Sequence, residues 1–340
     1  MKPRRFVLPL ALAVLTASVA LAADQTTVKR WPLGGGSLYD YLRFDGDSHR
    51  LYVARGTEFD VLNSDTGEVI RRITGLKRTH GIALVPSVGK GYITDGDGHT
   101  VTVVELKTLA VVTTIAVGGI KPDAIEFDPT SGKVYYADGG SHEIVAIDPA
   151  TDTVSGRVLL EGKLEGLTFD GKGRLFVNTE DKSEIQVVDT ASLKAVGKWS
   201  VAPGDGGTGI AIDTEHHRLF TACGNNLMVV VNADTGAVVG TVEIGEDPDG
   251  CAYDAGRGLI YTSNLDGTLS VIKQDSADHY SLARTVKTEF GARTIAIDTA
   301  GDRVFLPGGT FGPAPAPTPS VPEPKRPLIA GTFEILVVGN

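Results

Sequence analysis

Seven residues that could bind a ligand recur every 40 to 44 positions along the chain. Four are acids, two are basic side chains and one is a threonine: Asp40, His80, Asp123, Glu165, Thr208, Asp249 and Arg293. Carboxylate oxygens bind hard divalent cations and also pair with ammonium or guanidinium groups. Residues so far apart in sequence can share a site only if a repeated unit presents each one at the same place.

A second set of seven residues follows the first by 14 or 15 positions: Arg55, Asp95, Asp138, Thr179, Cys223, Asn264 and Gly308. The two sets hold six carboxylates, two arginines and one histidine, which predicts an electronegative opening that attracts cations. Crowding among the acids should also raise some of their pKa values.

Three interpretations of these sets stay open. One is a divalent-cation site that uses Asp95, Asp123, Asp138, Glu165 and His80. Another is a pocket for a cationic or polar ligand, with Arg55 and Arg293 as counter-charges. The third is a water-filled opening whose aspartates cap turns and accept backbone N–H groups.

Two histidines and two cysteines suggest further chemistry. His99 and His142 occupy equivalent turns of adjacent units, so they could share a transition metal or simply lie in solvated turns. Cys223 ends the second strand of one unit, and Cys251 begins the first strand of the next. Three interpretations remain: a disulfide, two separate thiols, or a copper or redox site. The chain has no CxxC, CxxCH or HExxH motif, which excludes haem attachment and a zincin-type zinc site.

The element that must position these residues is a repeat of four short strands. Its second strand carries an aromatic residue at a spacing of 40 to 44: Tyr52, Tyr92, Tyr135, Phe176, Phe220, Tyr261 and Phe305. First strands read LRFD, IALV, IEFD, LTFD, IAID, CAYD and IAID, with the alternation typical of β-structure. Four-stranded repeats of ~40–45 residues are typical of β-propeller blades.

We therefore predict an all-β, seven-bladed β-propeller as a single domain over residues 28–340. The predicted blades span about 39–77, 78–119, 120–162, 163–204, 205–246, 247–289 and 290–340, the last completed by residues 28–33. The seventh unit ends after its third strand, whereas VKRWPL (28–33) is a surplus strand before the first. Pairing the two closes the ring and removes two exposed sheet edges.

The second strands LYVA, GYIT, VYYA, LFVN, LFTA, IYTS and VFLP resemble the LYVTN core of the YVTN-repeat, YncE-like family of secreted β-propellers. The resemblance covers roughly residues 28–340. It implies a seven-bladed propeller and no single activity. The GH and WD dipeptides of WD40 repeats are missing.

Two segments stand outside the repeat. Residues 309–327 (GTFGPAPAPTPSVPEPKRP) interrupt the last blade, and their proline density favours polyproline II structure or disorder. We expect a tolerated loop insertion or a docking arm on the ligand-binding face. Residues 1–22 read as a signal peptide with a basic start, an apolar core and an Ala-Leu-Ala cleavage site, which predicts a periplasmic or secreted protein with no membrane span after cleavage.

The formal net charge of −10 becomes about −13 once the three basic residues of the signal peptide are removed. Nucleic-acid binding is therefore not expected, because phosphate-binding surfaces are basic. We expect a monomeric binding or scaffold protein whose partner is a protein or a small polar or cationic ligand. A divalent cation is the one cofactor the residues suggest. The alternative is a metal-dependent, lactonase-like hydrolase using Glu165, Asn264 and Asp249, although no nucleophile motif supports an enzyme.

Overall fold

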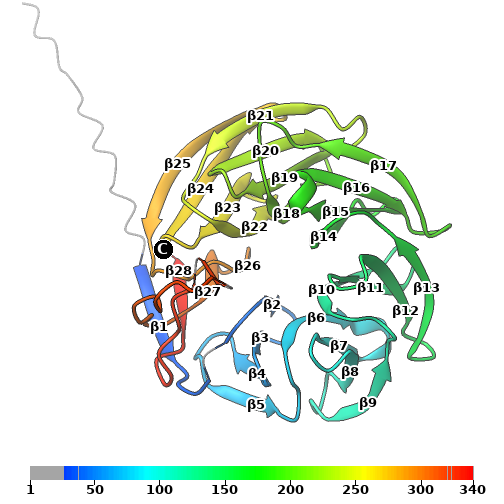
Figure 1. Ribbon diagram of the computed structural model, residues 1–340, viewed down its shortest axis with the longest axis vertical. Helices are drawn as coiled ribbons and strands as arrows, with labels where there is room; N and C mark the ends of the chain where they lie inside the picture. The colour runs from blue at the N-terminus through cyan, green and yellow to red at the C-terminus, as the bar shows by residue number, and fades with distance from the viewer. Residues whose placement is uncertain (1–26, 37, 320, 323, 340) are drawn as a thin grey trace, which may run out of the picture.

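The computed structural model describes residues 27–36, 38–319, 321–322 and 324–339. Seven four-stranded antiparallel sheets stand around a central channel, as Figure 1 shows. The prediction of a seven-bladed β-propeller is confirmed. Apart from two three-residue 3₁₀ turns, Pro86–Val88 and Glu180–Lys182, the described residues contain no helix.

Blades 1 to 4 follow one another along the chain, and each runs from the innermost to the outermost strand. Blade 1 comprises β2 (Leu42–Asp45), β3 (Arg50–Arg55), β4 (Glu58–Asn63) and β5 (Val69–Ile73). Blade 2 comprises β6 (Thr79–Val85), β7 (Lys90–Asp95), β8 (Thr100–Glu105) and β9 (Val111–Ala116). Blade 3 comprises β10 (Pro122–Asp128), β11 (Lys133–Asp138), β12 (Glu143–Asp148) and β13 (Thr153–Leu159). Blade 4 comprises β14 (Leu164–Phe169), β15 (Arg174–Thr179), β16 (Glu184–Asp189) and β17 (Lys194–Ser200).

Blades 5 and 6 repeat this order, and blade 7 combines both ends of the described chain. Blade 5 comprises β18 (Gly207–Asp213), β19 (Arg218–Cys223), β20 (Leu227–Asn232) and β21 (Val238–Glu243). Blade 6 comprises β22 (Pro248–Asp254), β23 (Leu259–Asn264), β24 (Thr268–Ser276) and β25 (His279–Lys287). Blade 7 comprises β26 (Ala296–Asp298), β27 (Arg303–Gly308), β28 (Glu334–Gly339) and β1 (Thr27–Pro32).

The ring closes as predicted, because β1 pairs antiparallel with β28 along its whole length, from Thr27 opposite Gly339 to Pro32 opposite Glu334. Pro32 lies in the outermost strand, where its missing N–H costs no ladder bond. Trp31 packs against Phe305 with ring centroids 5.8 Å apart. The blade therefore gains both a fourth strand and an aromatic contact from the start of the chain.

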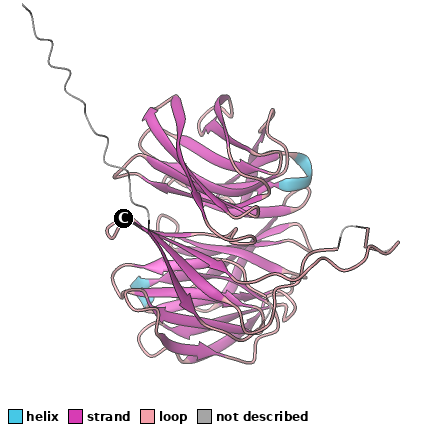
Figure 2. Cartoon of the chain, turned by 90° about the vertical axis from the view of Figure 1, so that its left-hand side faces the viewer, coloured by secondary structure: helices cyan, strands magenta, loops and turns pink. Residues whose placement is uncertain are grey.

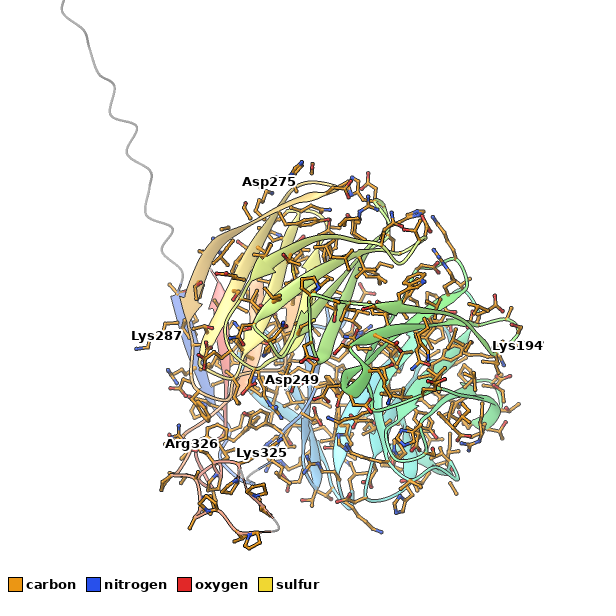
Figure 3. The ribbon with its side chains drawn as sticks, turned by 45° about the horizontal axis from the view of Figure 1, so that its top comes forward. Lys194, Asp249, Asp275, Lys287, Lys325 and Arg326 are labelled. Atoms are coloured by element: carbon orange, nitrogen blue, oxygen red, sulfur yellow. The ribbon has the colours of Figure 1, made fainter. Side chains whose placement is uncertain are left out.

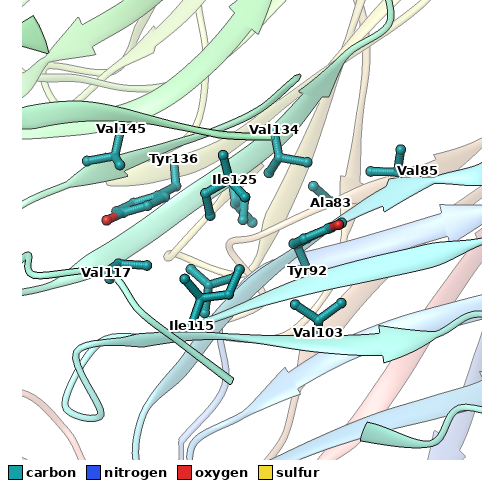
Figure 4. Packing of buried hydrophobic residues seen from close by; sticks show 12 residues of the cluster. Ala83, Val85, Tyr92, Val103, Ile115, Val117, Ile125, Val134, Tyr136 and Val145 are labelled. Carbon is teal, nitrogen blue, oxygen red and sulfur yellow. The ribbon is translucent and has the colours of Figure 1, made fainter. Parts of the chain in front are cut away.

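Hydrophobic cores lie between neighbouring blades, so both faces of each sheet are buried. Figure 4 shows the core between blades 2 and 3, where Tyr92, Val103 and Ile115 face Ile125 and Val134. The repeated aromatic residues predicted from sequence occupy these layers. Six of them are fully buried and Tyr261 is 5% exposed.

Basic residues at the start of second strands connect several blades to the next. Arg174 donates to the backbone oxygen of Ala233 at 2.6 Å and to Asp234 at 2.8 Å, in the following blade. Arg303 makes the equivalent contacts from blade 7 to Ser64 and Asp65 of blade 1. These bonds join adjacent blades on the face opposite the starts of the inner strands.

The proline-rich segment, residues 309–327, extends between β27 and β28 and is called the arm below. Figure 2 shows it reaching out from the propeller body as a long loop. Its base is ordered: Phe311 pairs with Leu328 in an isolated bridge, and the Phe311 and Phe290 rings lie 5.2 Å apart. Arg326 stacks over Phe290 at 4.4 Å from the ring centroid, so the arm starts from a rigid root.

The predicted signal peptide, residues 1–22, lies outside the described residues. Among the described residues, no helix has the length and apolar character needed to cross a membrane.

Replacing Trp31 with Ala should lower the free energy of unfolding by about 2–3 kcal/mol, because a large aromatic contact is lost in the blade that closes the ring. Urea denaturation followed by circular dichroism measures the change. Trp199→Ala is the matched control, since Trp199 packs on Phe176 at 5.6 Å in the continuous blade 4. Deleting residues 27–32 should cost more than Trp31→Ala, since it also exposes β28. A deletion as stable as the full chain would contradict closure by β1.

Candidate functional site

β-Bulges position five of the seven residues in the first predicted set. In β6, β10, β14, β18 and β22 the register with the second strand shifts just after the first residue of the strand. The shift falls at His80, Asp123, Glu165, Thr208 and Asp249. A bulge leaves residues unpaired and turns their side chains out of the regular alternation. In blades 2 to 6 the bulge therefore presents one side chain at the channel opening. We call this side of the propeller the mouth face.

Three of these side chains meet across blades 1 to 3. The Nδ1 atom of His80 lies 2.6 Å from Oδ2 of Asp40 and 3.3 Å from Oδ1 of Asp123. His80 is buried, with 2% of its surface exposed. Lys121 pairs with the other oxygen of Asp123 at 2.9 Å.

The side chains from blades 4 to 7 form ion pairs around the rest of the opening. Lys163 lies 2.8 Å from Oε1 of Glu165 and also pairs with Glu180. Arg293 pairs with Asp249 at 3.2 Å. Figure 3 labels Asp249 at the inner end of its blade, beside the channel. We call this group of eight side chains the vestibule: Asp40, His80, Lys121, Asp123, Lys163, Glu165, Asp249 and Arg293.

Beneath the vestibule a cavity of about 290 Å³ is lined by the inner strands of all seven blades. Tyr41 and Asp249 both border it, which places the cavity directly below the charged residues. Further in, Arg43 pairs with Glu126 through N–O distances of 2.7 and 2.9 Å. Because β2 and β10 belong to blades 1 and 3, this pair spans the inner face of blade 2. The site therefore has a charged rim, a mostly aliphatic wall that includes Tyr41, and a second charged pair deeper in the channel.

Asp95 and Asp138 of the second predicted set serve the backbone. Asp95 accepts N–H groups from Lys77, Arg78 and Gly98 at 2.7–3.1 Å. Asp138 accepts the N–H groups of Ile120, Lys121, Gly140 and Ser141 at 2.9–3.2 Å. Burial opposes ionisation of Asp138, but these donors outweigh it and its pKa is lowered. The third interpretation of the sequence, aspartates that cap turns, describes these two residues.

Other members of the two sets are also structural. Arg55 is buried against Asp60 at 2.5 Å and lies over the Phe333 ring, so it is no counter-charge at the opening. Asn264 donates to Thr268 and Ser270 at 3.0 and 3.1 Å, inside its own blade. Thr208 donates to the backbone oxygen of Pro248 at 2.8 Å, which joins blades 5 and 6. Gly308 packs beneath Leu336.

Sequence reasoning missed two vestibule residues, Lys121 and Lys163. Each stands two positions before its acid, in KPD and KLE, directly before the inner strand begins, where a long side chain can reach the acid. That spacing was the signal that could have found them. With Asp95, Asp138 and Arg55 assigned to the structure, the vestibule holds four carboxylates against Lys121, Lys163, Arg293 and His80. Its charge is closer to balance than the sequence predicted.

Burial raises the pKa of several vestibule acids, and repulsion between the acids, the predicted cause, adds to the shift. It raises the pKa of Glu165 to about 8, although Lys163 opposes the shift and Asp123 and Asp249 add to it. It raises the pKa of Asp40 to about 6, against the hydrogen bond with His80. Burial also raises the pKa of Asp249, which Arg293 partly offsets. The Glu165 carboxyl therefore holds a proton near neutral pH that a bound cation would displace.

The two turn histidines do not meet. His99 and His142 both have positive φ, at 55° and 57°, and each uses Nδ1 to contact a backbone oxygen, that of Ile120 or Gly162. Within the described part of the chain, only Asp40, His80 and Asp123 bring three possible metal-ligating atoms within 4.8 Å of one another. The predicted metal set with Asp95, Asp138 and Glu165 is thus not assembled.

Cys223 and Cys251 are free thiols in the structure rather than a disulfide. Cys223 packs in the core between blades 4 and 5, whereas Cys251 packs in the core between blades 5 and 6. The sheet of blade 5 thus separates the two packing layers, which is the physical reason that they do not pair. Burial raises the pKa of Cys223 to about 12, which makes its thiol a poor nucleophile.

Replacing Glu165 with Gln should flatten the pH dependence of stability. The pKa of Glu165 is higher in the folded state than its usual 4.5, so its contribution is present at low pH and is lost as the pH rises toward 8. The variant should lose at least about 1 kcal/mol less than the wild type between pH 5 and 9. Urea denaturation at both pH values measures this, with Glu215→Gln, exposed on the opposite face, as the control. Parallel profiles for Glu165→Gln and wild type would contradict the shift.

Replacing Asp138 with Ala should lower the free energy of unfolding by about 3 kcal/mol, since four backbone N–H groups lose their charged acceptor. Thermal and urea unfolding measure the loss. Asp97→Ala, in an exposed turn of the same face, is the control and should change stability little. A loss below about 1 kcal/mol would show that Asp138 is not a structural residue.

Comparison with known proteins supports the architecture. No known protein family and no curated protein sequence matches the chain. A solved structure of Kuenenia stuttgartiensis hydrazine synthase superposes with a TM-score of 0.69 and 15% sequence identity, over 80% of this chain and 92% of that chain. At this identity the likeness shows the fold alone, a β-propeller.

Proposed function

We propose that this chain is an exported propeller of the YVTN-repeat kind that captures a small organic cation or zwitterion in the vestibule. It acts as a binding protein, and the cavity under the vestibule receives the rest of the ligand. The signal-peptide pattern at residues 1–22 and the acidic mature chain support export and a cationic ligand.

One observation carries the proposal. Four carboxyl groups from four different blades, those of Asp40, Asp123, Glu165 and Asp249, lie in the vestibule above a cavity that Tyr41 borders. Burial and these four acids raise the pKa of Tyr41 well above its usual value. Acids around the Tyr41 ring favour an organic cation, which gains charge pairing and contact with the ring.

The cations already at the rim support the same chemistry. Ammonium groups of Lys121 and Lys163 pair with Asp123 and Glu165, and the guanidinium of Arg293 pairs with Asp249. Both lysine side chains are about half exposed, at 47% and 53%, so they can move aside at little cost. A ligand amine would take their place on the acids, and the displaced lysines could then pair with a carboxylate of a zwitterion.

A metal-dependent hydrolase is the second candidate, and the Asp40–His80–Asp123 group is the observation that favours it. The predicted catalytic cage does not support it, because Asn264 is fully buried and its amide nitrogen is bonded within blade 6. Assaying a panel of lactones with and without chelator tests this candidate. Chelator-sensitive turnover would favour it, and no turnover with any metal would exclude it for these substrates.

Titration calorimetry of the mature protein with putrescine, arginine, choline and acetate tests the binding proposal. Cations and zwitterions should bind and acetate should not. Combining Glu165→Gln with Asp249→Asn should weaken cation binding by at least about 10-fold, or 1.4 kcal/mol, since two of the four acids are lost. Asp97→Asn, on the same face but outside the vestibule, should leave the affinity unchanged. Acetate binding without cation binding, or equal affinity in the double variant, would overturn the proposal.

A further inference from the structure

The Asp40, His80 and Asp123 side chains form a compact group on one side of the vestibule. One oxygen of each carboxylate and Nδ1 of the imidazole lie within 4.8 Å of one another. Lys121 pairs with Oδ2 of Asp123, whereas Oδ1 faces the histidine. The oxygen that points into the group is therefore not the one that the lysine uses.

The backbone holds all three residues in place through contacts between blades. Thr294 donates its hydroxyl to the oxygen of Asp40 at 2.8 Å, and Thr94 does the same to Asp123 at 2.8 Å. The N–H of Tyr41 donates to the oxygen of His80 at 3.0 Å. Groups held this way need little reorganisation to bind a ligand.

The hydrogen bonding of His80 is incomplete, although 98% of the residue is buried. Its Nδ1 can carry at most one proton but faces two carboxylate oxygens. Its Nε2 has no hydrogen-bond partner among the described residues. Buried polar atoms without hydrogen-bond partners are uncommon. Because Nε2 has no partner, no hydrogen bond there fixes which ring nitrogen carries the proton. A cation bound to Nδ1 and both oxygens would satisfy these three atoms at once, with the ring proton then on Nε2.

We propose that Asp40, His80 and Asp123 bind one divalent transition-metal ion through His80 Nδ1 and one oxygen of each carboxylate. One imidazole and two carboxylates suit Mn²⁺, Fe²⁺ or Zn²⁺ better than Ca²⁺, which prefers six to eight oxygens. Three protein ligands leave coordination positions for water or a ligand atom. The ion and the proposed organic ligand would share Asp40 and Asp123, but metal binding is tested without that ligand and does not need its other acids, Glu165 and Asp249.

Metal titration of the chelator-treated mature protein tests the proposal with Mn²⁺, Zn²⁺, Co²⁺, Ca²⁺ and Mg²⁺ as the probes. We expect one Mn²⁺, Zn²⁺ or Co²⁺ per chain by calorimetry and elemental analysis, with weaker Ca²⁺ and Mg²⁺ binding. The Co²⁺ absorption spectrum should show nitrogen and oxygen ligation without a thiolate band, which excludes Cys223 and Cys251.

Variants locate the ion. Asp40→Asn and His80→Gln should each weaken metal binding by at least about 100-fold. Mutating a group that only hydrogen-bonds to a metal ligand already costs about 10–100-fold in affinity, and losing the ligand itself should cost more. His99→Gln and Asp97→Asn, in a turn of the same face, are the matched controls and should bind like wild type. Binding that survives both ligand variants would overturn the site. If a variant fails to fold, the wild-type titration decides: no stoichiometric transition metal overturns the proposal.

Discussion

Closure of the ring is the constraint on which the rest of this structure depends. Each blade buries its two faces only against its neighbours, so a ring with one open junction would expose two apolar sheet faces. The pairing of β1 with β28 supplies the fourth strand of blade 7, and Trp31 packs on Phe305 there. Because the two ends of the chain share this blade, closure is a long-range interaction that forms only once all seven blades are present.

The same closure assembles the vestibule. Blades 7 and 1 meet where Thr294 bonds the backbone of Asp40 and where the Tyr39 hydroxyl donates to the oxygen of Gly291. The Phe311 ring at the root of the arm lies against Gly291, where a side chain would collide with it. The arm, the closing blade and the vestibule are thus one continuous packed region. A partner that bound the arm would sit beside the opening.

Electrostatic balance gives the vestibule its character. Seven repeated positions could have formed a ring of bare acids, which would repel one another at short range. Instead Lys121, Lys163 and Arg293 each pair with an acid from the same or the adjacent blade. The pairing is not complete: the pKa of Glu165 is still raised, and Nε2 of His80 has no hydrogen-bond partner among the described residues. A cation bound in the vestibule would stabilise the ionised form of these carboxyl groups.

The sequence by itself determined the architecture, because local rules encode it: the alternation of IEFD, the aromatic at Tyr135 and its equivalents, and the turn residues between strands repeat every 40 to 44 positions. It also identified the positions that come together at the opening. Only the tertiary structure decided which of them are free for function. Asp138 and Asp123 look alike in sequence, but loop N–H groups surround the first, whereas a bulge turns the second toward His80 from another blade. The sequence around a residue does not show which distant loops and blades it contacts. The roles of these side chains therefore followed only from the packing of the folded chain.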